Sequence, residues 1–315
     1  MSIRTGRPLT LWMGVLALCS LLPIRAAKSQ PPSSVDDCII HCVSYKMDIP
    51  ITKFPGEYIS LQFLAADAAG RETIRSYLSS PIQLAGVQHI FIVAEPSDEY
   101  LAMAKSATNT MVHFTVDQGG MLAARFGVRP EAGGVVVLDR DRKELWRVDG
   151  PSGSAMNSDA FAARLRSSWR PAAVDQYNLP KGSTLAVQGY DVVAYFMEDK
   201  ARKGDPKFVS EYRGVTYRFS SAKNRDAFNA APVSYLPTFG GWCASAIGAK
   251  GEKVEIDPTS FKVKDGRLFL FYKGIFADAL KDWNKNEKAW EPAADANWKK
   301  IAGEDPVRAA KGVKE

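Results

Sequence analysis

Three side chains that could bind a metal or carry out redox chemistry lie within five residues of one another: Cys38, His41 and Cys42. Thiolates and imidazoles are the donors that copper and zinc prefer, and a pair of thiols can exchange with a disulfide. We expect a structural disulfide between Cys38 and Cys42. A site for copper or another soft metal at Cys38, His41 and Cys42 is one alternative, and unpaired structural thiols are another.

A second group of candidate residues lies in an aromatic-rich stretch of the C-terminal half. Tyr190, Tyr195 and Trp242 could line a pocket for a flat ligand, and Cys243 would be its thiol. Core packing is the competing interpretation, because one aromatic ring buries a large area and a cysteine can act as a small hydrophobic residue. We expect the segment 239–244 to pack at the centre of this half, and keep the four residues as candidate ligand contacts.

Other chemistries are excluded by missing residues. The chain has three histidines, and the last is His113, so the C-terminal half offers no imidazole. No Gly-x-Ser-x-Gly elbow, phosphate loop or His-Glu-x-x-His motif is present. The formal charge is +6, and the charges beyond the first residues are interleaved, so we expect no nucleic-acid partner.

The first 29 residues are typical of an export signal. Arg4 and Arg7 precede an apolar run over 9–22, and Ala27 and Ser29 are small residues suited to cleavage. The run is too short for a membrane span, so we expect no transmembrane segment after cleavage. Export predicts a periplasmic or secreted protein in an oxidising compartment, where Cys38, Cys42 and Cys243 remain.

Strands and helices alternate along the part of the chain that follows Cys38, His41 and Cys42. Residues 30–50 form a cysteine-containing N-terminal segment, and residues 51–170 contain strands and helices in turn. The apolar runs predict strands over 58–64, 89–94, 112–116, 135–139 and 144–148, and helical spacing predicts helices over 71–78, 98–107, 120–126 and 161–169. This order favours an α/β domain with a mixed central sheet and flanking helices.

The stretches FTVDQGGMLAARFGV and VVVLDRDRKELWRVDG give this domain its family resemblance. The domain resembles thioredoxin-like, redoxin-type proteins over 51–170. The resemblance implies a redox loop starting at Phe63, where Ala68 and Arg71 occupy the two cysteine positions and Gly133 that of the cis-proline. A degenerate active site follows, because thiolate chemistry needs a sulfur. The Cys38-x-x-x-Cys42 spacing is similar to that of copper-delivery proteins, whose motif lies in the redox loop.

The C-terminal half follows a polar linker over 171–185 and ends in a charged tail over 304–315. The segments GYDVVAYF and FGGWCASA resemble the exported branch of the YHS domain, which implies a small α+β domain over 186–303. The family's histidine is absent, since the matching tripeptide is 208–210 (Phe-Val-Ser). Its cysteine positions correspond to Ser220 and Asn224, so a conventional metal site is not expected. No internal repeat is apparent.

These observations predict an exported, non-enzymatic binding or assembly protein of the cell envelope. Its partner would be an envelope protein or a small ligand, and a link to metal or redox homeostasis follows only by family association. The competing function is that of a thiol–disulfide oxidoreductase or copper-delivery protein that uses Cys38 and Cys42.

Overall fold

The computed structural model describes residues 38–65, 67–80, 82–107, 109, 111–129, 132–150, 156–168 and 176–307. All of them fall within one compact unit. The expected export signal, residues 171–175 of the expected linker and residues 308–315 of the tail lie outside the described residues. Within the described part, no helix is both long enough and apolar enough to cross a bilayer.

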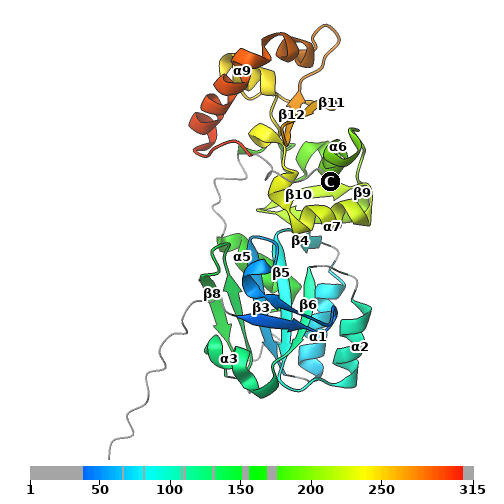
Figure 1. Ribbon diagram of the computed structural model, residues 1–315. Coiled ribbons are helices and arrows are strands. Elements are labelled where there is room, and N and C mark those ends of the chain that lie inside the picture. Colours follow the sequence, from blue (N-terminus) through cyan, green and yellow to red (C-terminus); the bar gives the residue numbers. More distant parts are fainter. Residues whose placement is uncertain are drawn as a thin grey trace, which may run out of the picture. The chain divides into compact units, whose positions relative to one another are not determined.

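A seven-stranded mixed sheet forms the centre of the N-terminal half (Figure 1). Its spatial order is β2-β1-β6-β5-β3-β7-β8, and only the β3–β5 and β5–β6 pairs are parallel. The strands are β1 (Ile39–Cys42), β2 (Met47–Pro50), β3 (Tyr58–Leu64), β5 (Val87–Val93), β6 (Val112–Val116), β7 (Gly134–Leu138) and β8 (Glu144–Asp149). This is the thioredoxin-like α/β fold that the sequence predicted.

Helices cover both faces of this sheet, because its central strands are apolar on both sides. Every residue of β5 is buried, as expected for a strand inside a parallel arrangement. Tyr77 of α1 (Ala68–Leu78), Tyr100 of α2 (Asp98–Ser106) and Phe161 of α5 (Ser158–Ser168) belong to one core cluster. Ala123 of α3 (Met121–Arg125) belongs to a second cluster, built on the alternate residues of the same strands.

The C-terminal half contains a tandem structural repeat, which corrects the expectation that none is present. Repeat 1 consists of the turn η5 (Ala186–Gly189), α6 (Val192–Glu198), the hairpin β9 (Asp205–Tyr212) and β10 (Val215–Phe219), and α7 (Ala222–Ala230). Repeat 2 consists of the turn η7 (Thr238–Gly241), α8 (Ala244–Lys250), the hairpin β11 (Asp257–Lys264) and β12 (Arg267–Phe271), and α9 (Ala279–Ala302). Every element from the turn through the second strand begins and ends 52 residues further on.

The backbone conformations repeat at the same interval. Val187, Gln188 and Gly189 have positive φ, and so do their counterparts Phe239, Gly240 and Gly241. The hairpin turns recur as well, with positive φ at 213–214 and at 265–266. A parallel bridge joins Leu185 to Thr216 in repeat 1, and its counterpart joins Pro237 to Leu268 in repeat 2. Such agreement at strained positions shows that the two repeats share one chain path.

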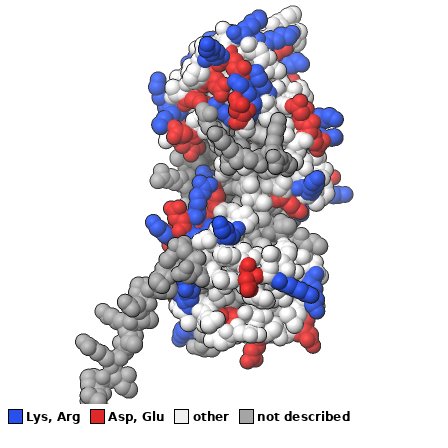
Figure 2. All heavy atoms as spheres, viewed as in Figure 1, with Lys and Arg blue, Asp and Glu red and all other residues white. Residues whose placement is uncertain are grey.

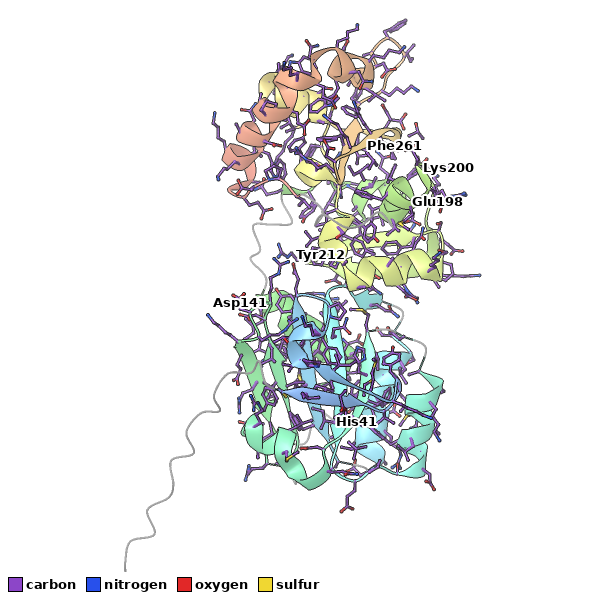
Figure 3. All side chains as sticks on the ribbon, in the orientation of Figure 1. His41, Asp141, Glu198, Lys200, Tyr212 and Phe261 are labelled. Atoms are coloured by element: carbon purple, nitrogen blue, oxygen red, sulfur yellow. The ribbon has the colours of Figure 1, made fainter. Side chains whose placement is uncertain are left out.

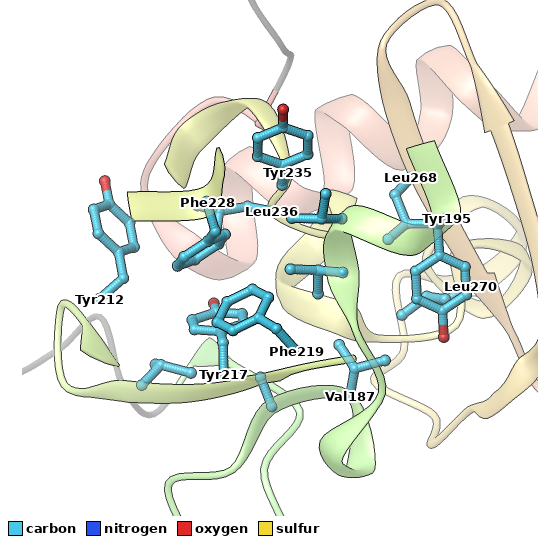
Figure 4. Packing of buried hydrophobic residues seen from close by; sticks show 14 of the residues in the cluster. Val187, Tyr195, Tyr212, Tyr217, Phe219, Phe228, Tyr235, Leu236, Leu268 and Leu270 are labelled. Carbon is cyan, nitrogen blue, oxygen red and sulfur yellow. The ribbon is translucent and has the colours of Figure 1, made fainter. Parts of the chain in front are cut away.

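The two repeats share a hydrophobic core (Figure 4). Tyr195, Phe219 and Phe228 of repeat 1 belong to the same cluster as Leu268 and Leu270 of repeat 2. A second cluster lies within repeat 2, where α9 packs Trp283 and Trp298 against Phe239 and Phe269. Since apolar area of both repeats is buried in the common cluster, we expect them to fold as one module.

Hydrogen bonds also link this module to residues before it. β4 (Ile82–Leu84) pairs with β9 in a three-stranded sheet of order β10-β9-β4. The described end of the expected linker is also bonded to repeat 2: the Gln176 carbonyl accepts from Trp242 Nε1 at 2.7 Å, and Asn178 N–H donates to the Gly240 carbonyl at 2.8 Å.

Candidate functional site

The loop that would carry thiol chemistry follows β3 and opens α1. Asp67 is the N-cap of α1, and its Oδ1 accepts a hydrogen bond from Gly70 N–H at 2.8 Å. Ala68 begins the helix, and Arg71 one turn later forms an ion pair with Glu99 at 2.9 Å. The two positions that need sulfur therefore hold a methyl group and a paired guanidinium, neither of which is a nucleophile.

Gly133 occupies the position expected for the cis-proline, and its surroundings admit no side chain. Its φ is +68°, and a Cβ there would lie 2.7 Å from the Phe63 carbonyl oxygen at the end of β3. The chain thus approaches β3 closely at this point, which is a role that only glycine fills.

The expected disulfide between Cys38 and Cys42 is wrong, because both thiols are free. Cys38 directly precedes strand β1 (Ile39–Cys42), and residues four apart along an extended chain are separated by about 13 Å. A disulfide needs Cα atoms within about 7 Å. The sequence reasoning assumed a turn here, whereas the segment pairs with β2 in a hairpin and with β6 at the sheet edge.

The expected metal ligands do not converge either. His41 lies on the exposed face of β1 (Figure 3) and its Nδ1 is 2.7 Å from Asp48 Oδ1, while Cys42 points to the buried face. Across the described ranges, no group of three or more His, Cys, Asp or Glu side chains is arranged to hold a metal ion. Strand alternation is the reason, since neighbouring residues point to opposite faces.

Cys38 and Cys42 lie in different environments. Cys38 borders a surface hollow of about 630 Å³ that also contacts His41 and Met121. Burial raises the pKa of the Cys38 thiol, and the charge of Arg125 offsets only part of that rise. A raised pKa keeps the thiol protonated, which is opposite to the requirement for a nucleophile.

Cys42 ends a buried chain of polar side chains. Its Sγ is 4.0 Å from His113 Nδ1, and His113 Nε2 is 2.5 Å from Gln88 Oε1. Gln88 Nε2 in turn donates to Met111 Sδ at 3.3 Å. Burial lowers the pKa of His113 to about 4, so the imidazole is neutral and the Nε2 proton goes to Gln88. Nδ1 is then an acceptor that faces the Cys42 thiol.

A cavity of about 100 Å³ lies at the amino ends of β5 and β6. This is the opposite end of the parallel strands from the α1 loop, since Tyr77 and Ser80 at the end of α1 line it. Strands, helices and connecting segments all contribute to its lining: Tyr77, Ser80, Gln83, Leu84, Val87, His89, Asn109, Met111, Val112, Ser158, Asp159, Ala162 and Arg166. Sequence reasoning missed this site.

His89 is a buried titratable group beside this cavity. Its ring lies 4.7 Å from that of Tyr77 and 5.0 Å from that of Phe161, measured between centroids. Burial, helped by the nearby His113, lowers the pKa of His89 to about 3. His89 is therefore neutral at physiological pH, and Gln62 Nε2 lies 3.5 Å from its Nδ1.

Unpaired polar atoms surround the same histidine. Ser60 is the register partner of His89 on β3, and its hydroxyl is buried without a hydrogen-bond partner. Gln62 Oε1 is likewise buried and unpaired. Both residues lie behind His89 and do not line the cavity, so the polar lining itself comes from His89 with Gln83, Asn109 and Ser158. The signal in the sequence was a histidine inside an otherwise apolar strand, since His89 lines the cavity.

The one cation among the described residues that line the cavity is already paired. Arg166 donates to both carboxylate oxygens of Glu211, at 2.6 and 2.5 Å. Asp159 also lines the cavity, near the start of α5. With Arg166 paired and His89 neutral, the arrangement suits an uncharged ligand better than an anion.

The four candidate ligand contacts of the C-terminal half are dispersed over its two cores. Tyr195 is buried, donates to the Pro258 carbonyl at 2.8 Å, and stacks edge-on against Phe261 (labelled in Figure 3). Cys243 belongs to the same cluster, whereas Tyr190 is only partly buried beside it. Trp242 is partly buried against the cluster within repeat 2 that contains Trp283 and Trp298, and Lys253 Nζ lies 5.6 Å from the centre of its ring.

A carboxylate organises the positions where the resemblance would place metal-binding cysteines. Asp191 is fully buried, and its Oδ1 accepts from the N–H groups of Val193 and Ala194. Its Oδ2 accepts from Ser220 N–H, Ser220 Oγ and Asn224 Nδ2, each at 2.7 Å. Ser220 and Asn224 are thus donors to a buried anion, which is a structural role.

Comparisons with known proteins gave matches among solved structures alone. No protein-family model matches the chain, and no curated protein sequence matches it. Among solved structures, the chain is similar to the exposed lipoprotein thioredoxin Etrx1 of Streptococcus pneumoniae, with 16% identity, 41% of this chain and 98% of that chain covered, and a TM-score of 0.32. It is also similar to a secreted Mycobacterium tuberculosis disulfide oxidoreductase homologous to Escherichia coli DsbE, with 16% identity, coverage of 43% and 99%, and a TM-score of 0.33.

A third similar structure is StoA of Bacillus subtilis, with 15% identity, coverage of 42% and 98%, and a TM-score of 0.30. At such identities the likeness concerns the fold alone. The fold of the N-terminal half rests on the strand order described above, and no activity is carried over from these structures.

Proposed function

We propose that this protein is an exported, non-enzymatic binding protein of the cell envelope, and that its thioredoxin-like part holds a small uncharged polar ligand beside His89. The cavity carries the proposal, since neutral His89 lines it together with the polar side chains of Gln83, Asn109 and Ser158. A cavity of about 150 Å³ is enough for a benzene-sized molecule. One of about 100 Å³ fits a ligand of a few heavy atoms.

The non-enzymatic half of the proposal rests on the sulfur positions. Ala68 and Arg71 replace the redox cysteines, and Cys38 and Cys42 lie at the two ends of an extended segment, both as free thiols. Export rests on the composition of residues 1–29. For the C-terminal module we propose a divergent YHS-type function in binding or assembly, in which the Asp191 network replaces a metal site.

Acetamide is a suitable probe of the cavity, because it is neutral, has only a few heavy atoms and can both donate and accept hydrogen bonds. We expect added acetamide to shift the NMR signals of the His89 ring and the Met111 methyl in saturable fashion. Ala162→Leu places extra carbon atoms in the cavity and should abolish the shifts, since Ala162 lines it. Ala163→Leu is the matched control, on the next, exposed position of α5. Unchanged His89 and Met111 signals, or equal binding by Ala162→Leu, would refute the site.

Insulin reduction tests the absence of thiol chemistry. We expect no turnover above background. Turnover that is lost in Cys38→Ser would instead establish the competing function, a thiol oxidoreductase that uses the cysteines of β1.

A further inference from the structure

Repeat 2 contains a five-residue insertion that repeat 1 lacks. In repeat 1, Ser220 follows β10 and is followed directly by Ser221, the N-cap of α7. In repeat 2, Tyr272 follows β12, but the N-cap of α9 is Asp278. Residues 273–277 (Lys-Gly-Ile-Phe-Ala) are therefore additional to the shared chain path. Because repeat 1 closes without them, they are not needed to connect the strand to the helix.

The insertion forms a closed tip (Figure 1). Gly274 N–H donates to the Ala277 carbonyl at 2.9 Å, and an antiparallel bridge joins Lys273 to Asp278. Below them, Ala279 N–H donates to the Tyr272 carbonyl at 3.1 Å. Gly274 lies so close to the Tyr272 ring that a Cβ would be 2.4 Å from its hydroxyl oxygen. These contacts fix the backbone on both sides of Ile275 and Phe276.

The tip presents the two most exposed large hydrophobic side chains among the described residues. Ile275 is 93% exposed and Phe276 is 99% exposed. Tyr272 at the base is 41% exposed. Single exposed apolar residues are common, but two adjacent ones on a preformed projection indicate a surface that becomes covered.

Exposed lysines accompany the tip. Lys273 lies within the insertion, and Lys281, Lys285 and Lys288 follow on the first turns of α9 at helical spacing, which places them on one face. The acids nearest to them are Asp278 and Asp282, which leaves an excess of two positive charges. Figure 2 shows Lys and Arg gathered at this end of the C-terminal module, with Asp and Glu between them.

We propose that this tip inserts into the surface of an anionic lipid bilayer. Two side chains bury only about 150–250 Å² each, whereas a stable protein interface needs roughly 800 Å² from each partner. Binding to a bilayer has no such minimum area. Its free energy combines the insertion of apolar side chains with the attraction between lysines and anionic headgroups. The convex apolar tip beside a lysine face has the chemistry of a peripheral membrane contact.

Vesicle sedimentation with residues 34–315 tests the proposal, because this unit is compact and omits the apolar run over 9–22. Vesicles of phosphatidylglycerol mixed with phosphatidylcholine should bind the protein, and pure phosphatidylcholine should bind it far less. The double variant Ile275→Ser/Phe276→Ser should weaken binding roughly tenfold or more. Lys281→Gln, Lys285→Gln and Lys288→Gln should each weaken it about fivefold at low salt.

Met197→Ser is the matched control, because Met197 is 56% exposed on α6, outside the tip. This variant should bind vesicles as the parent protein does, and all variants should keep its melting temperature. Equal binding by the parent and the Ile275→Ser/Phe276→Ser variant would overturn the proposal. So would a parent protein that stays in solution with both vesicle types, or a dimer that requires Phe276.

Discussion

Repeats 1 and 2 follow the same backbone path, yet they stabilise it with different chemistry. At the N-cap of the short helix, repeat 1 has Asp191 with five hydrogen bonds, and repeat 2 has Cys243, whose Sγ accepts one from Tyr272 N–H at 3.3 Å. Tyr272 is the counterpart of Ser220, whose N–H donates to Asp191. The same donor position is thus satisfied by a carboxylate in one repeat and by a thiol in the other.

At the first residue of β10 and β12, the charged side chain lies in repeat 2 and the uncharged one in repeat 1. Val215 of repeat 1 is a fully buried apolar residue, and its counterpart Arg267 is a fully buried cation. Arg267 is paired with Glu291 at 2.8 Å and Asp295 at 2.5 Å on α9, and its guanidinium lies over the rings of Phe239 and Phe269. Asp191 and Arg267 are therefore fully buried charged groups at different positions of the shared chain path. The chain path is conserved between the repeats, while the polar interior is not.

The largest expected effect comes from removing the Asp191 carboxylate. Asp191→Ala leaves the donors of 193, 194, 220 and 224 buried and unpaired, so we expect a loss of about 5 kcal/mol in the free energy of unfolding. Cys243→Ala at the equivalent position removes a single weak acceptor and should cost about 1–2 kcal/mol. Urea unfolding of both variants measures the difference. Equal losses would contradict the contrast between the two N-caps.

Arg267→Met should cost about 3–5 kcal/mol, because it leaves Glu291 and Asp295 without their buried partner. The triple variant Arg267→Met/Glu291→Leu/Asp295→Leu should recover most of that loss, since it replaces the ionic group with apolar side chains like those of repeat 1. Thermal and urea melts of the two variants give the comparison. A triple variant that is less stable than Arg267→Met would show that the cation has no apolar substitute.

Acid should distinguish the thioredoxin-like part from both repeats. The pKa values of His113 and His89 are about 4 and about 3 in the folded protein, against about 6.5 in an unfolded chain. Below pH 6.5 the unfolded chain takes up protons that the folded chain does not, so stability falls as pH falls. The loss between pH 7 and pH 5 should be about 2 kcal/mol for each histidine.

Hydrogen exchange at pH 7 and pH 5 would check this prediction. Protection should decrease in β5 and β6, and His113→Gln should reduce the decrease. The repeats contain no histidine, so protection in β10 and β12 should change little. A larger loss of protection in β10 and β12 than in β5 would refute the attribution of acid sensitivity to His89 and His113.

The smallest effect should come from deleting residues 273–277. Repeat 1 joins its strand to its helix without them, and the tip's apolar side chains contribute little to the core. We expect a change in unfolding free energy of about 1 kcal/mol or less, measured by urea unfolding. A deletion that unfolds the module would show that the repeats differ in more than an insertion.

The alternating elements of the N-terminal half could be predicted because each strand has its own apolar run. The fold of that half and its mixed sheet followed directly from β3, β5, β6, β7 and β8. β1 and β2 were missed, since Ile39 and Met47 on the exposed face break the apolar pattern. The predicted disulfide between Cys38 and Cys42 was wrong because strand β1 was missed. The spacing of two cysteines alone does not distinguish a strand from a turn.

The repeat was hidden because few residue types coincide at the 52-residue interval. Gly189 and Gly241 match, as do the Asp-Pro pairs at 205 and 257, Gly214 and Gly266, and Phe219 and Phe271. Most of these are positions where the backbone turns, whereas the buried side chains have been exchanged. The cavity beside His89 was equally hidden, since its lining comes from elements that are distant in the chain.

The three cysteines of the described residues are all buried and free. Within the described part of the chain, no cross-link among these three has to form before the native state is reached. Reducing agents in a sample should therefore leave the architecture of this part intact. Buried thiols also escape alkylation until the structure opens, so their labelling rate reports directly on how often each part of the protein unfolds.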